Sequence, residues 1–333
     1  MNQELLRETV RMMMADGKGI LAADESNETA DKRLAAIDVI GGEESRRKYR
    51  DLFLSAPGVE KYLSGVILFD ETIRQNALDG EPFVQKLTRL GIVPGIKVDR
   101  GAKDLPGFPG EKITEGLDGL GTRLAEYFAI GARFAKWRAV ITIGETIPTD
   151  ADIDANADAL ARYAALCQEA GVVPMVEPEV LLDGDHTIAR AEEVTTRTVV
   201  KLFEKLSEYR VWLPGVILKT SMVLPGNKSG EQKSSTEIAE ATVRYLKAAV
   251  PAEVGGVVFL SGGQTPEEAT DNLDAIAKLG SLPWPITFSY ARALQGPTLE
   301  AWMGRDENVD AARAVFMQRL EESVLADQGK FRA

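Results

Sequence analysis

Residues 215–223, Gly-Val-Ile-Leu-Lys-Thr-Ser-Met-Val, place one lysine inside a short apolar run rich in β-branched residues. Leu-Pro-Gly brackets this run on both sides, at 213–215 and at 224–226. A short apolar run between turn residues is typical of a buried strand. Because burial disfavours the charged form of an amine, we expect the pKa of Lys219 to be lowered, which makes it a nucleophile toward carbonyls. The stretch therefore predicts a lysine that forms a Schiff base.

Seven other short apolar runs lie along the chain, and polar residues stand at or just beyond the end of each. These runs occupy residues 19–23, 65–69, 92–96, 134–135, 172–176, 257–260 and 285–288. Helical patterns separate most of them and are predicted at 2–15, 29–37, 44–54, 82–90, 117–129, 152–169, 188–207, 232–249, 266–278 and 298–327. Strands that alternate with helices imply a parallel sheet, and eight such units fit an α/β fold of the (β/α)8 TIM-barrel type better than an open sheet. We expect one domain over residues 1–333, with an N-terminal helix and a helical tail.

Two features fit this fold less well, and one further segment is predicted to lie outside the barrel strands. The fourth run is the weakest strand prediction, because Lys136 and Arg138 interrupt it. Pro94 and Pro174 are tolerable in a closed barrel only near the starts of their strands. The segment 100–115 is rich in Gly and Pro, and we expect it to be a loop that acts as a lid beside the barrel mouth.

The bulk composition restricts the possible partners and the compartment. A formal net charge of −12 argues against a nucleic acid or an anionic membrane as partner, so any phosphate site must be built from local groups. The single cysteine, Cys167, excludes an internal disulfide, fits a reducing compartment and is best interpreted as a core residue. The N-terminus lacks the pattern of a secretory signal and no apolar run could span a bilayer, so we expect a cytoplasmic protein.

The chain has one histidine, His186, which lies in the polar stretch 182–186. We expect it to be a solvated loop residue. A zinc site with several histidines or three cysteines is excluded by this composition. A Ser-His-Asp triad would have to use His186, which has no nucleophile elbow to serve. The composition therefore argues against zinc-dependent and serine-triad hydrolases.

Three lysines, Lys97, Lys136 and Lys219, end or interrupt the third, fourth and sixth runs. For any one of them alone, a structural ion pair with a carboxylate is the favoured interpretation. Three together, in a fold whose strand ends converge, indicate a site instead. We expect them to lower one another's pKa by like-charge repulsion and to provide an anion-binding surface.

Three carboxylates are candidates for proton transfer. Glu177 and Glu179 flank Pro178 after the fifth run and share a face, because they stand two residues apart on a strand. Either could be a general acid/base whose pKa is raised by burial, or the pair could simply neutralise the lysines. Asp24 ends the first run, where it could stay ionised and accept a proton from a substrate hydroxyl, or form a salt bridge to Lys136 or Lys219.

Residues 261–264, Ser-Gly-Gly-Gln, form a Gly-rich turn that opens onto the predicted helix at 266–278. Exposed backbone amides at a helix N-terminus suit a phosphate, which makes Ser261, Gly262 and Gly263 candidates to bind one. Gly-Gly also marks ordinary turns, so this signal is weak by itself. It gains weight because TIM barrels often hold phosphate after their last two strands, where Arg292 adds a positive charge.

Taken together, these residues make the sequence resemble class I fructose-1,6-bisphosphate aldolases of the animal and plant type. Eight segments in order carry the resemblance, over roughly residues 10 to 325: 17–26 (Gly-Lys-Gly-Ile-Leu-Ala-Ala-Asp-Glu-Ser), 64–69, 95–99, 116–120, 134–138 (Phe-Ala-Lys-Trp-Arg), 176–179 (Val-Glu-Pro-Glu), 259–264 and 288–295. The resemblance implies reversible cleavage of fructose 1,6-bisphosphate to dihydroxyacetone phosphate and glyceraldehyde 3-phosphate, with no metal and no cofactor. It also implies a homo-oligomer, commonly a tetramer in this family.

The resemblance also implies roles for matched residues. Lys219 matches the Schiff-base lysine, Glu177 the acid/base for carbinolamine dehydration, and Asp24 the base at the C4 hydroxyl. Lys136 and Arg138 match groups that assist charge and proton handling. The residues that match the C1-phosphate site are Ser261, Gly262, Ser289 and Arg292, and those that match the other phosphate region are Ser26, Thr29, Lys97 and Arg33.

The sequence departs from the family at three places. Ala291 replaces a glycine of the family whose amide can approach phosphate, and Glu28 puts a carboxylate beside the other phosphate region. The chain ends Lys-Phe-Arg-Ala at 330–333, without the terminal tyrosine that aids proton exchange at C3 in animal enzymes.

Two alternatives stay open. One is another Schiff-base barrel enzyme, such as a transaldolase or a single-phosphate aldolase. The other is a non-catalytic scaffold that retains the fold, which intact Lys219, Glu177, Asp24 and Lys136 argue against.

Overall fold

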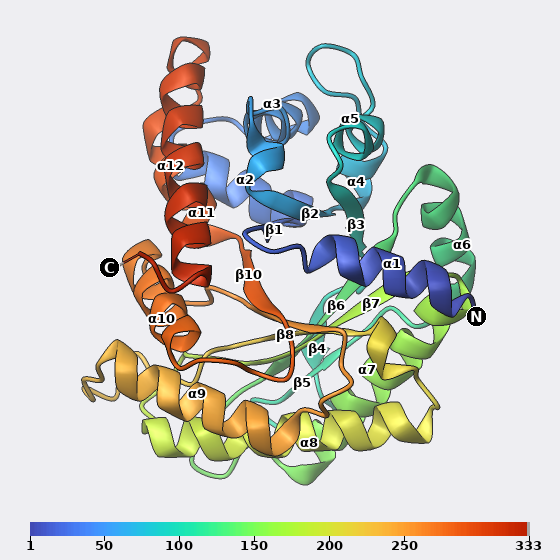
Figure 1. Ribbon diagram of the computed structural model, residues 1–333, viewed down its shortest axis with the longest axis vertical. Helices are drawn as coiled ribbons and strands as arrows, with labels where there is room; N and C mark the ends of the chain where they lie inside the picture. The colour runs from blue at the N-terminus through green and yellow to red at the C-terminus, as the bar shows by residue number, and fades with distance from the viewer. Residues whose placement is uncertain (332–333) are drawn as a thin grey trace.

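The computed structural model describes residues 1–331, and a closed barrel of eight parallel strands lies at its centre (Figure 1). Around the barrel the strands follow the order β1, β10, β9, β8, β7, β6, β3, β2. Their bounds are β1 Gly19–Ala23, β2 Leu63–Leu68, β3 Val93–Lys97, β6 Phe134–Ile141, β7 Val173–Val180, β8 Ile217–Thr220, β9 Gly256–Phe259 and β10 Ile286–Tyr290. The predicted TIM barrel is confirmed.

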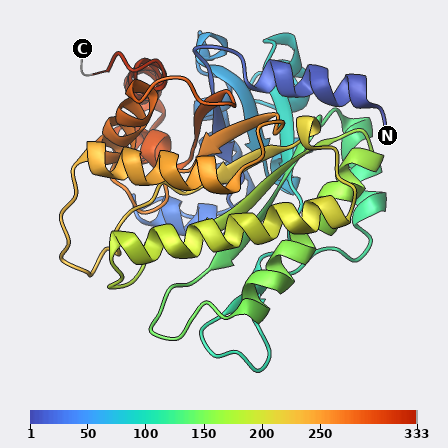
Figure 2. The same cartoon turned by 60° about the horizontal axis from the view of Figure 1, so that its bottom comes forward.

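Helices surround this barrel, and Figure 2 shows α8 and α9 side by side along its outer face. The helices are α1 Gln3–Met13, α2 Asn27–Ala35, α3 Glu43–Leu54, α4 Asp70–Ile73, α5 Phe83–Arg89, α6 Leu120–Ile130, α7 Asp150–Glu169, α8 Ile188–Glu208, α9 Ser235–Ala249, α10 Pro266–Lys278, α11 Arg292–Trp302 and α12 Val309–Asp327. Short 3₁₀ turns lie at Val59–Lys61, Leu213–Gly215 and Asp306–Asn308. Among residues 1–331, no helix combines the length and the apolar character needed to cross a membrane.

Side chains fill the barrel at the amino ends of its strands, and α1 packs against these side chains. Leu6, Val10 and Met13 of α1 belong to the same buried cluster as inward-facing strand residues such as Ile20 and Phe134. The ring of Phe134 occupies space that Gly95 leaves open, because a Cβ at Gly95 would lie 2.2 Å from that ring. The barrel is therefore a packed core at this end, and chemistry is confined to the opposite, carboxyl end of the strands.

The fourth strand, β6, corrects the sequence-based expectation. It is eight residues long and pairs with β7 over its whole length, so the prediction that this was the weakest strand is wrong. Lys136 and Arg138 interrupt the apolar pattern because alternate residues of the strand face the barrel interior, where a cavity accepts polar groups. Pro94 and Pro174 are each the second residue of their strands, as the barrel requires.

The C-terminal segment and the cysteine test two further expectations. The prediction of one helix over 298–327 is wrong, because Met303 and Gly304 adopt left-handed conformations, with φ of 52° and 69°, and separate α11 from α12. Cys167 is buried in α7, as expected of a core residue.

The departure at the chain end, residues 330–333, lies partly outside the described residues, because the structure does not describe Arg332 and Ala333.

The segment 100–115 is not a plain loop. It forms a two-stranded antiparallel ribbon from β4 Ala102–Asp104 and β5 Lys112–Thr114, and β5 contacts β6 and α7. Its buried Glu111 accepts hydrogen bonds from the backbone amide of Thr149 at 2.5 Å and from its hydroxyl at 2.9 Å. Because Thr149 caps the N-terminus of α7, the ribbon is attached to the start of that helix.

Asp152 lies beside this attachment and is fully buried in the first turn of α7. Its Oδ1 accepts a hydrogen bond of 2.9 Å from Asn156, whereas Oδ2 has no partner among the described residues. Burial, and then the negative charge of Glu111, raise the pKa of Asp152 to about 7. The carboxyl group is therefore half protonated near neutral pH.

The substitution Asp152→Asn is expected to flatten the pH dependence of stability. A raised pKa in the folded state means that stability is lost as pH rises from about 4 to about 7, because the unfolded chain ionises first. Asparagine cannot ionise, so the free energy of unfolding at pH ~8 should exceed that of the wild type by about 1–3 kcal/mol, with little gain at pH ~5. Urea unfolding at the two pH values measures this difference.

Asp150→Asn is the matched control, because Asp150 opens the same helix but its side chain is 98% exposed. Equal pH dependence in the Asp152 variant and the wild type would contradict the assignment.

Candidate active site

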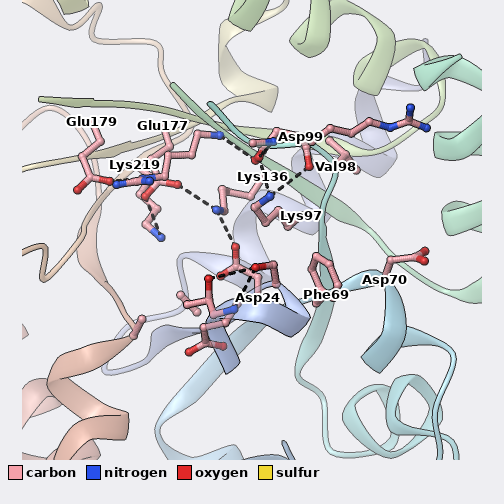
Figure 3. A pocket seen from close by; sticks show the side chains of 18 of the residues that line it. Asp24, Phe69, Asp70, Lys97, Val98, Asp99, Lys136, Glu177, Glu179 and Lys219 are labelled. Atoms are coloured by element: carbon pink, nitrogen blue, oxygen red, sulfur yellow. Dashed lines mark hydrogen bonds and ion pairs between the residues drawn. The ribbon is translucent and has the colours of Figure 1, made fainter. Parts of the chain in front are cut away.

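A cavity of about 930 Å³ opens at the carboxyl ends of the strands (Figure 3). It collects fourteen of the fifteen residues predicted from the sequence: Asp24, Ser26, Thr29, Arg33, Lys97, Lys136, Arg138, Glu177, Glu179, Lys219, Ser261, Gly262, Ser289 and Arg292. Gly263 is the exception. It lines a small neighbouring pocket instead, and a Cβ there would lie 2.9 Å from the Leu182 side chain. Its role in binding phosphate stays a prediction.

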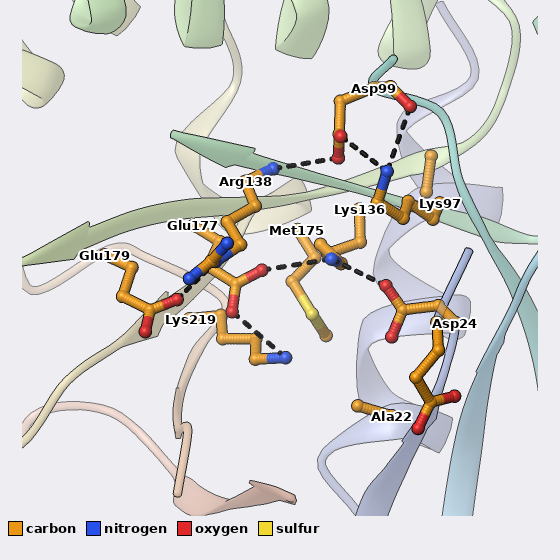
Figure 4. A network of polar contacts seen from close by, with 12 residues as sticks. Ala22, Asp24, Lys97, Asp99, Lys136, Arg138, Met175, Glu177, Glu179 and Lys219 are labelled. Atoms are coloured by element: carbon orange, nitrogen blue, oxygen red, sulfur yellow. Dashed lines mark hydrogen bonds and ion pairs between the residues drawn. The ribbon is translucent and has the colours of Figure 1, made fainter. Parts of the chain in front are cut away.

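Four charged side chains form an alternating chain across the cavity floor (Figure 4). Lys219 Nζ lies 3.1 Å from Glu177 Oε1, and Lys136 Nζ lies 3.3 Å from Glu177 Oε2. The same Lys136 Nζ lies 2.6 Å from Asp24 Oδ2. The side chains of Lys219, Glu177 and Lys136 are at most 5% exposed, so each cation depends on its neighbouring carboxylate.

The barrel register produces this arrangement. Lys136 and Arg138 stand two residues apart on β6, as Glu177 and Glu179 do on β7, and β6 pairs with β7 so that Arg138 lies opposite Glu177. Lys219 is the third residue of the four-residue strand β8, the next strand around the barrel. Side chains two apart on a strand share a face, so three neighbouring strands aim their charges into one cavity.

The two carboxylates of this chain are ionised. Burial by itself would raise the pKa of Glu177, but Lys219 and Lys136 outweigh it and hold the pKa below its usual range. The prediction that burial lifts the pKa of Glu177 is therefore wrong. Burial opposes ionisation of Asp24 too, and Lys136 and Lys219 together lower its pKa to about 2.

Lys136 departs from the prediction in the same way. Burial favours its neutral form, but the charges of Asp24 and Glu177 outweigh burial and raise its pKa. The predicted lowering by the other lysines is wrong for Lys136, because the carboxylates lie closer to it. Lys136 is therefore a cation that lies between two ionised carboxylates.

A second group of ion pairs borders this chain. Arg138 pairs through Nε with Glu179 Oε2, so Glu179 neutralises an arginine and not one of the three lysines. Lys97 Nζ donates to Asp99 Oδ1 at 2.6 Å, and Asp99 Oδ2 accepts a hydrogen bond of 3.2 Å from the Arg138 backbone amide. Asp99 was not among the residues predicted from the sequence, although its place two residues after Lys97 at a strand end was a usable signal.

One polar region lies after β9 and β10. Ser289 Oγ is buried and has no hydrogen-bond partner among the described residues. Gly262 adopts a left-handed conformation with φ of +53°, and its carbonyl accepts a hydrogen bond from Arg292. Ala291, which stands where the family has glycine, has a negative φ of −112° and so does not occupy the left-handed region that favours glycine.

The other polar region lies at the start of α2. Ser26 is the N-cap of this helix, and its Oγ lies 3.0 Å from the hydroxyl of Thr29. Lys97 and Arg33 also line the cavity. Glu28 is 79% exposed and pairs with Lys32 at 2.8 Å, so its charge is largely directed into solvent.

His186 is not a solvated loop residue, which corrects the prediction. It is buried against the small pocket beside Gly263, and burial lowers its pKa. Its carbonyl accepts a hydrogen bond of 2.8 Å from Gly226, which joins the segment after β7 to the segment after β8. The pairing of these two distant segments could not be read from the sequence.

A closed (β/α)8 barrel whose carboxyl end holds a buried amine between carboxylates is the architecture of a TIM-barrel enzyme. A sequence model of the class I fructose-bisphosphate aldolases of glycolysis matches residues 4–333, and the chain belongs to this family. The prediction of a carbon–carbon lyase of this class is confirmed.

Relatives match along nearly the whole chain. A probable fructose-bisphosphate aldolase class 1 from Xanthomonas axonopodis pv. citri is 54% identical over 333 residues, which is 100% of both chains. The cytosolic fructose-bisphosphate aldolase 5 of Arabidopsis thaliana is 50% identical and covers 98% of this chain and 91% of its own. The fructose-bisphosphate aldolase of Plasmodium falciparum, solved with TRAP and a small-molecule inhibitor, superposes with a TM-score of 0.97 at 46% identity, covering 99% of this chain and 96% of its own.

Removing the central cation by Lys136→Met should disable the site. Asp24 and Glu177 would lose the charge that lies between them, so their pKa values should rise and the acid limb of the kcat/KM profile should move to higher pH. We expect kcat to fall by roughly 10²-fold or more. A cleavage assay over pH of about 5 to 9 measures both effects.

Lys97→Met is the matched control, because Lys97 pairs with Asp99 and lies outside the alternating chain. It should change KM with a much smaller displacement of the acid limb. An unmoved acid limb in the Lys136 variant would argue against its place between the carboxylates.

Proposed function

We propose that Lys219 forms the imine through which this class I aldolase reversibly cleaves fructose 1,6-bisphosphate to dihydroxyacetone phosphate and glyceraldehyde 3-phosphate. The observation that carries this proposal is the 3.1 Å contact between Lys219 Nζ and Glu177 Oε1 inside the buried end of the barrel. An ionised Glu177 can take a proton from the lysine as a ketone arrives, which frees the amine electron pair to attack carbon.

Imine formation follows from the same contact. The amine of Lys219 adds to the C2 carbonyl and gives a carbinolamine. The proton held by Glu177 then passes to the carbinolamine hydroxyl, which leaves as water. The product is a protonated imine, and Glu177 is ionised again.

In the step that cleaves the carbon–carbon bond, we assign the role of base to Asp24. With a pKa of about 2 it is ionised, and it accepts the proton of the C4 hydroxyl. The electron pair of the C3–C4 bond moves into the imine, glyceraldehyde 3-phosphate leaves, and an enamine remains on Lys219. Protonation at C3 and hydrolysis of the imine then release dihydroxyacetone phosphate. Lys136 stabilises the charge that moves between Asp24 and Glu177, and Arg138 with Glu179 borders the reacting carbons.

Two groups of cavity-lining residues that contain cations, one after β9 and β10 and one that includes the start of α2, support a substrate with two phosphates. We assign the C1-phosphate to Ser261, Gly262, Ser289 and Arg292. The unpartnered Ser289 hydroxyl supports this assignment, because a buried polar atom without a partner is costly unless a ligand satisfies it. We assign the other phosphate to Ser26, Thr29, Lys97 and Arg33.

Several wider expectations stay proposals. We propose that residues 1–333 act as one domain, that the protein is a cytoplasmic homo-oligomer, and that neither a nucleic acid nor a membrane is a partner. Relatives from plants that carry the word cytosolic in their names support the compartment. We also propose that no metal ion or cofactor takes part, because a protonated imine is itself the electron sink that cleavage needs.

Reductive trapping tests the proposed function. Incubation with dihydroxyacetone phosphate and borohydride should add one reduced adduct to Lys219, located by peptide mass spectrometry. Lys219→Arg should give no adduct and should lower cleavage by roughly 10³-fold or more, because the guanidinium is not a nucleophile.

Lys97→Arg is the matched control and should still be labelled at Lys219. Cleavage should persist in excess chelator. An adduct on any other lysine, or loss of cleavage on chelation, would overturn the proposed mechanism.

A further inference from the structure

Glu25 stands directly after Asp24 and lines the cavity on the side of Arg33 and Ser26. It is buried, and it lies where we place a substrate phosphate. A buried carboxylate beside a phosphate dianion is repulsive unless cations lie between them or behind the carboxylate. The surroundings of Glu25 therefore decide whether this side of the cavity can bind an anion.

Two arginines neutralise Glu25 from opposite sides. Arg33 pairs through Nη1 with Oε1, and Arg50 pairs through Nη1 with Oε2. Arg50 Nη2 also donates to the Glu25 carbonyl at 2.8 Å, and Tyr49 donates its hydroxyl to Oε1 at 3.1 Å. Burial would raise the pKa of Glu25, but Arg50 and then Arg33 outweigh it, so the carboxylate is ionised.

The two arginines differ in what they can reach. Arg33 lines the cavity and its side chain is 21% exposed, whereas the side chain of Arg50 is 2% exposed and lies behind Glu25, outside the cavity lining. The Arg50 guanidinium lies 4.9 Å from the centre of the Tyr49 ring, which helps to fix it. A phosphate can therefore recruit Arg33 but not Arg50.

We propose that Arg50 is a positioning residue for the aldol reaction, which neutralises Glu25 from behind so that Arg33 is free to bind a substrate phosphate. The inference rests on the proposed function, in which Arg33 contacts phosphate. If Arg33 were the only cation on Glu25, its recruitment would leave a buried carboxylate without a partner, which is strongly unfavourable. Glu25 would then compete with the phosphate for Arg33. With Arg50 paired to Glu25, Arg33 can bind the phosphate and Glu25 at the same time.

Arg50→Met is expected to raise KM for fructose 1,6-bisphosphate roughly tenfold or more, because Glu25 then holds Arg33, with a much smaller change in kcat. The inhibition constant of inorganic phosphate should rise in parallel. Arg50→Lys keeps one charge but cannot hold the carboxylate and the carbonyl together, so it should raise KM less. It also serves as the second variant if the methionine variant fails to fold.

The double variant Arg50→Met/Glu25→Gln separates positioning from general structural damage. Removing the buried charge together with its counter-ion frees Arg33, so KM should return toward the wild-type value. A purely structural role for Arg50 predicts no such rescue. An unchanged KM in folded Arg50→Met, or a raised KM that the double variant does not lower, would overturn the inference.

Arg319→Met is the matched control. Arg319 is also buried, and it donates to the Pro266 carbonyl and the Thr270 hydroxyl, each at 2.7 Å, outside the cavity. Its loss should lower Tm without raising KM. Borohydride trapping of the wild type with dihydroxyacetone phosphate distinguishes the two proposals, because no adduct at Lys219 overturns the proposed function, whereas an adduct with an unaltered KM in the Arg50 variant overturns only the inference.

Discussion

The active centre depends on one carboxylate held between two buried ammonium groups. Glu177 lies 3.1 Å from Lys219 and 3.3 Å from Lys136, and all three side chains are almost completely removed from water. Desolvating each charge costs several kcal/mol, and Glu177 offsets part of this cost for both lysines, with Asp24 as a second anion beside Lys136. Removing the carboxylate would leave two like charges facing each other in a medium of low dielectric. The four side chains therefore form one network whose charges alternate in sign from Lys219 to Asp24, and the loss of one charge destabilises its neighbours.

The same principle recurs at the edge of the cavity. Arg138 pairs with Glu179, Lys97 pairs with Asp99, and Glu25 lies between Arg33 and Arg50. Arg138, Lys97 and Arg33, which line the cavity, each have a carboxylate partner that holds them while no anion is bound. An entering phosphate must compete with that carboxylate, so the groups behind the ion pairs matter as much as the groups that touch the ligand.

Much of this site was predictable because in a TIM barrel the carboxyl ends of parallel strands converge on one face. Polar residues at the ends of apolar runs, such as Asp24, Lys97 and Lys219, could be assigned to one cavity without coordinates. The directions in which the pKa values of Glu177 and Lys136 shift could not be predicted, because they depend on which opposite charges lie beside each group in the fold. Arg50 was equally invisible, since an arginine in a helix pattern gives no sign that it reaches across to a strand end. The burial of His186 depends on contacts between segments some forty residues apart, which no local pattern encodes.

The sequence by itself determined the barrel, the family and the lysine, because hydrophobic periodicity and strand-end motifs are local properties of the chain. Only the tertiary structure decided which charges pair, because pairing depends on the register of β6 against β7 and on side chains that arrive from different strands. For that reason Lys219 could be placed in an apolar strand, and proposed as the reactive lysine, from the sequence. The ion pair between Lys219 and Glu177, and the buried Arg50 that we propose keeps Glu25 from competing with a phosphate, became visible only in the fold.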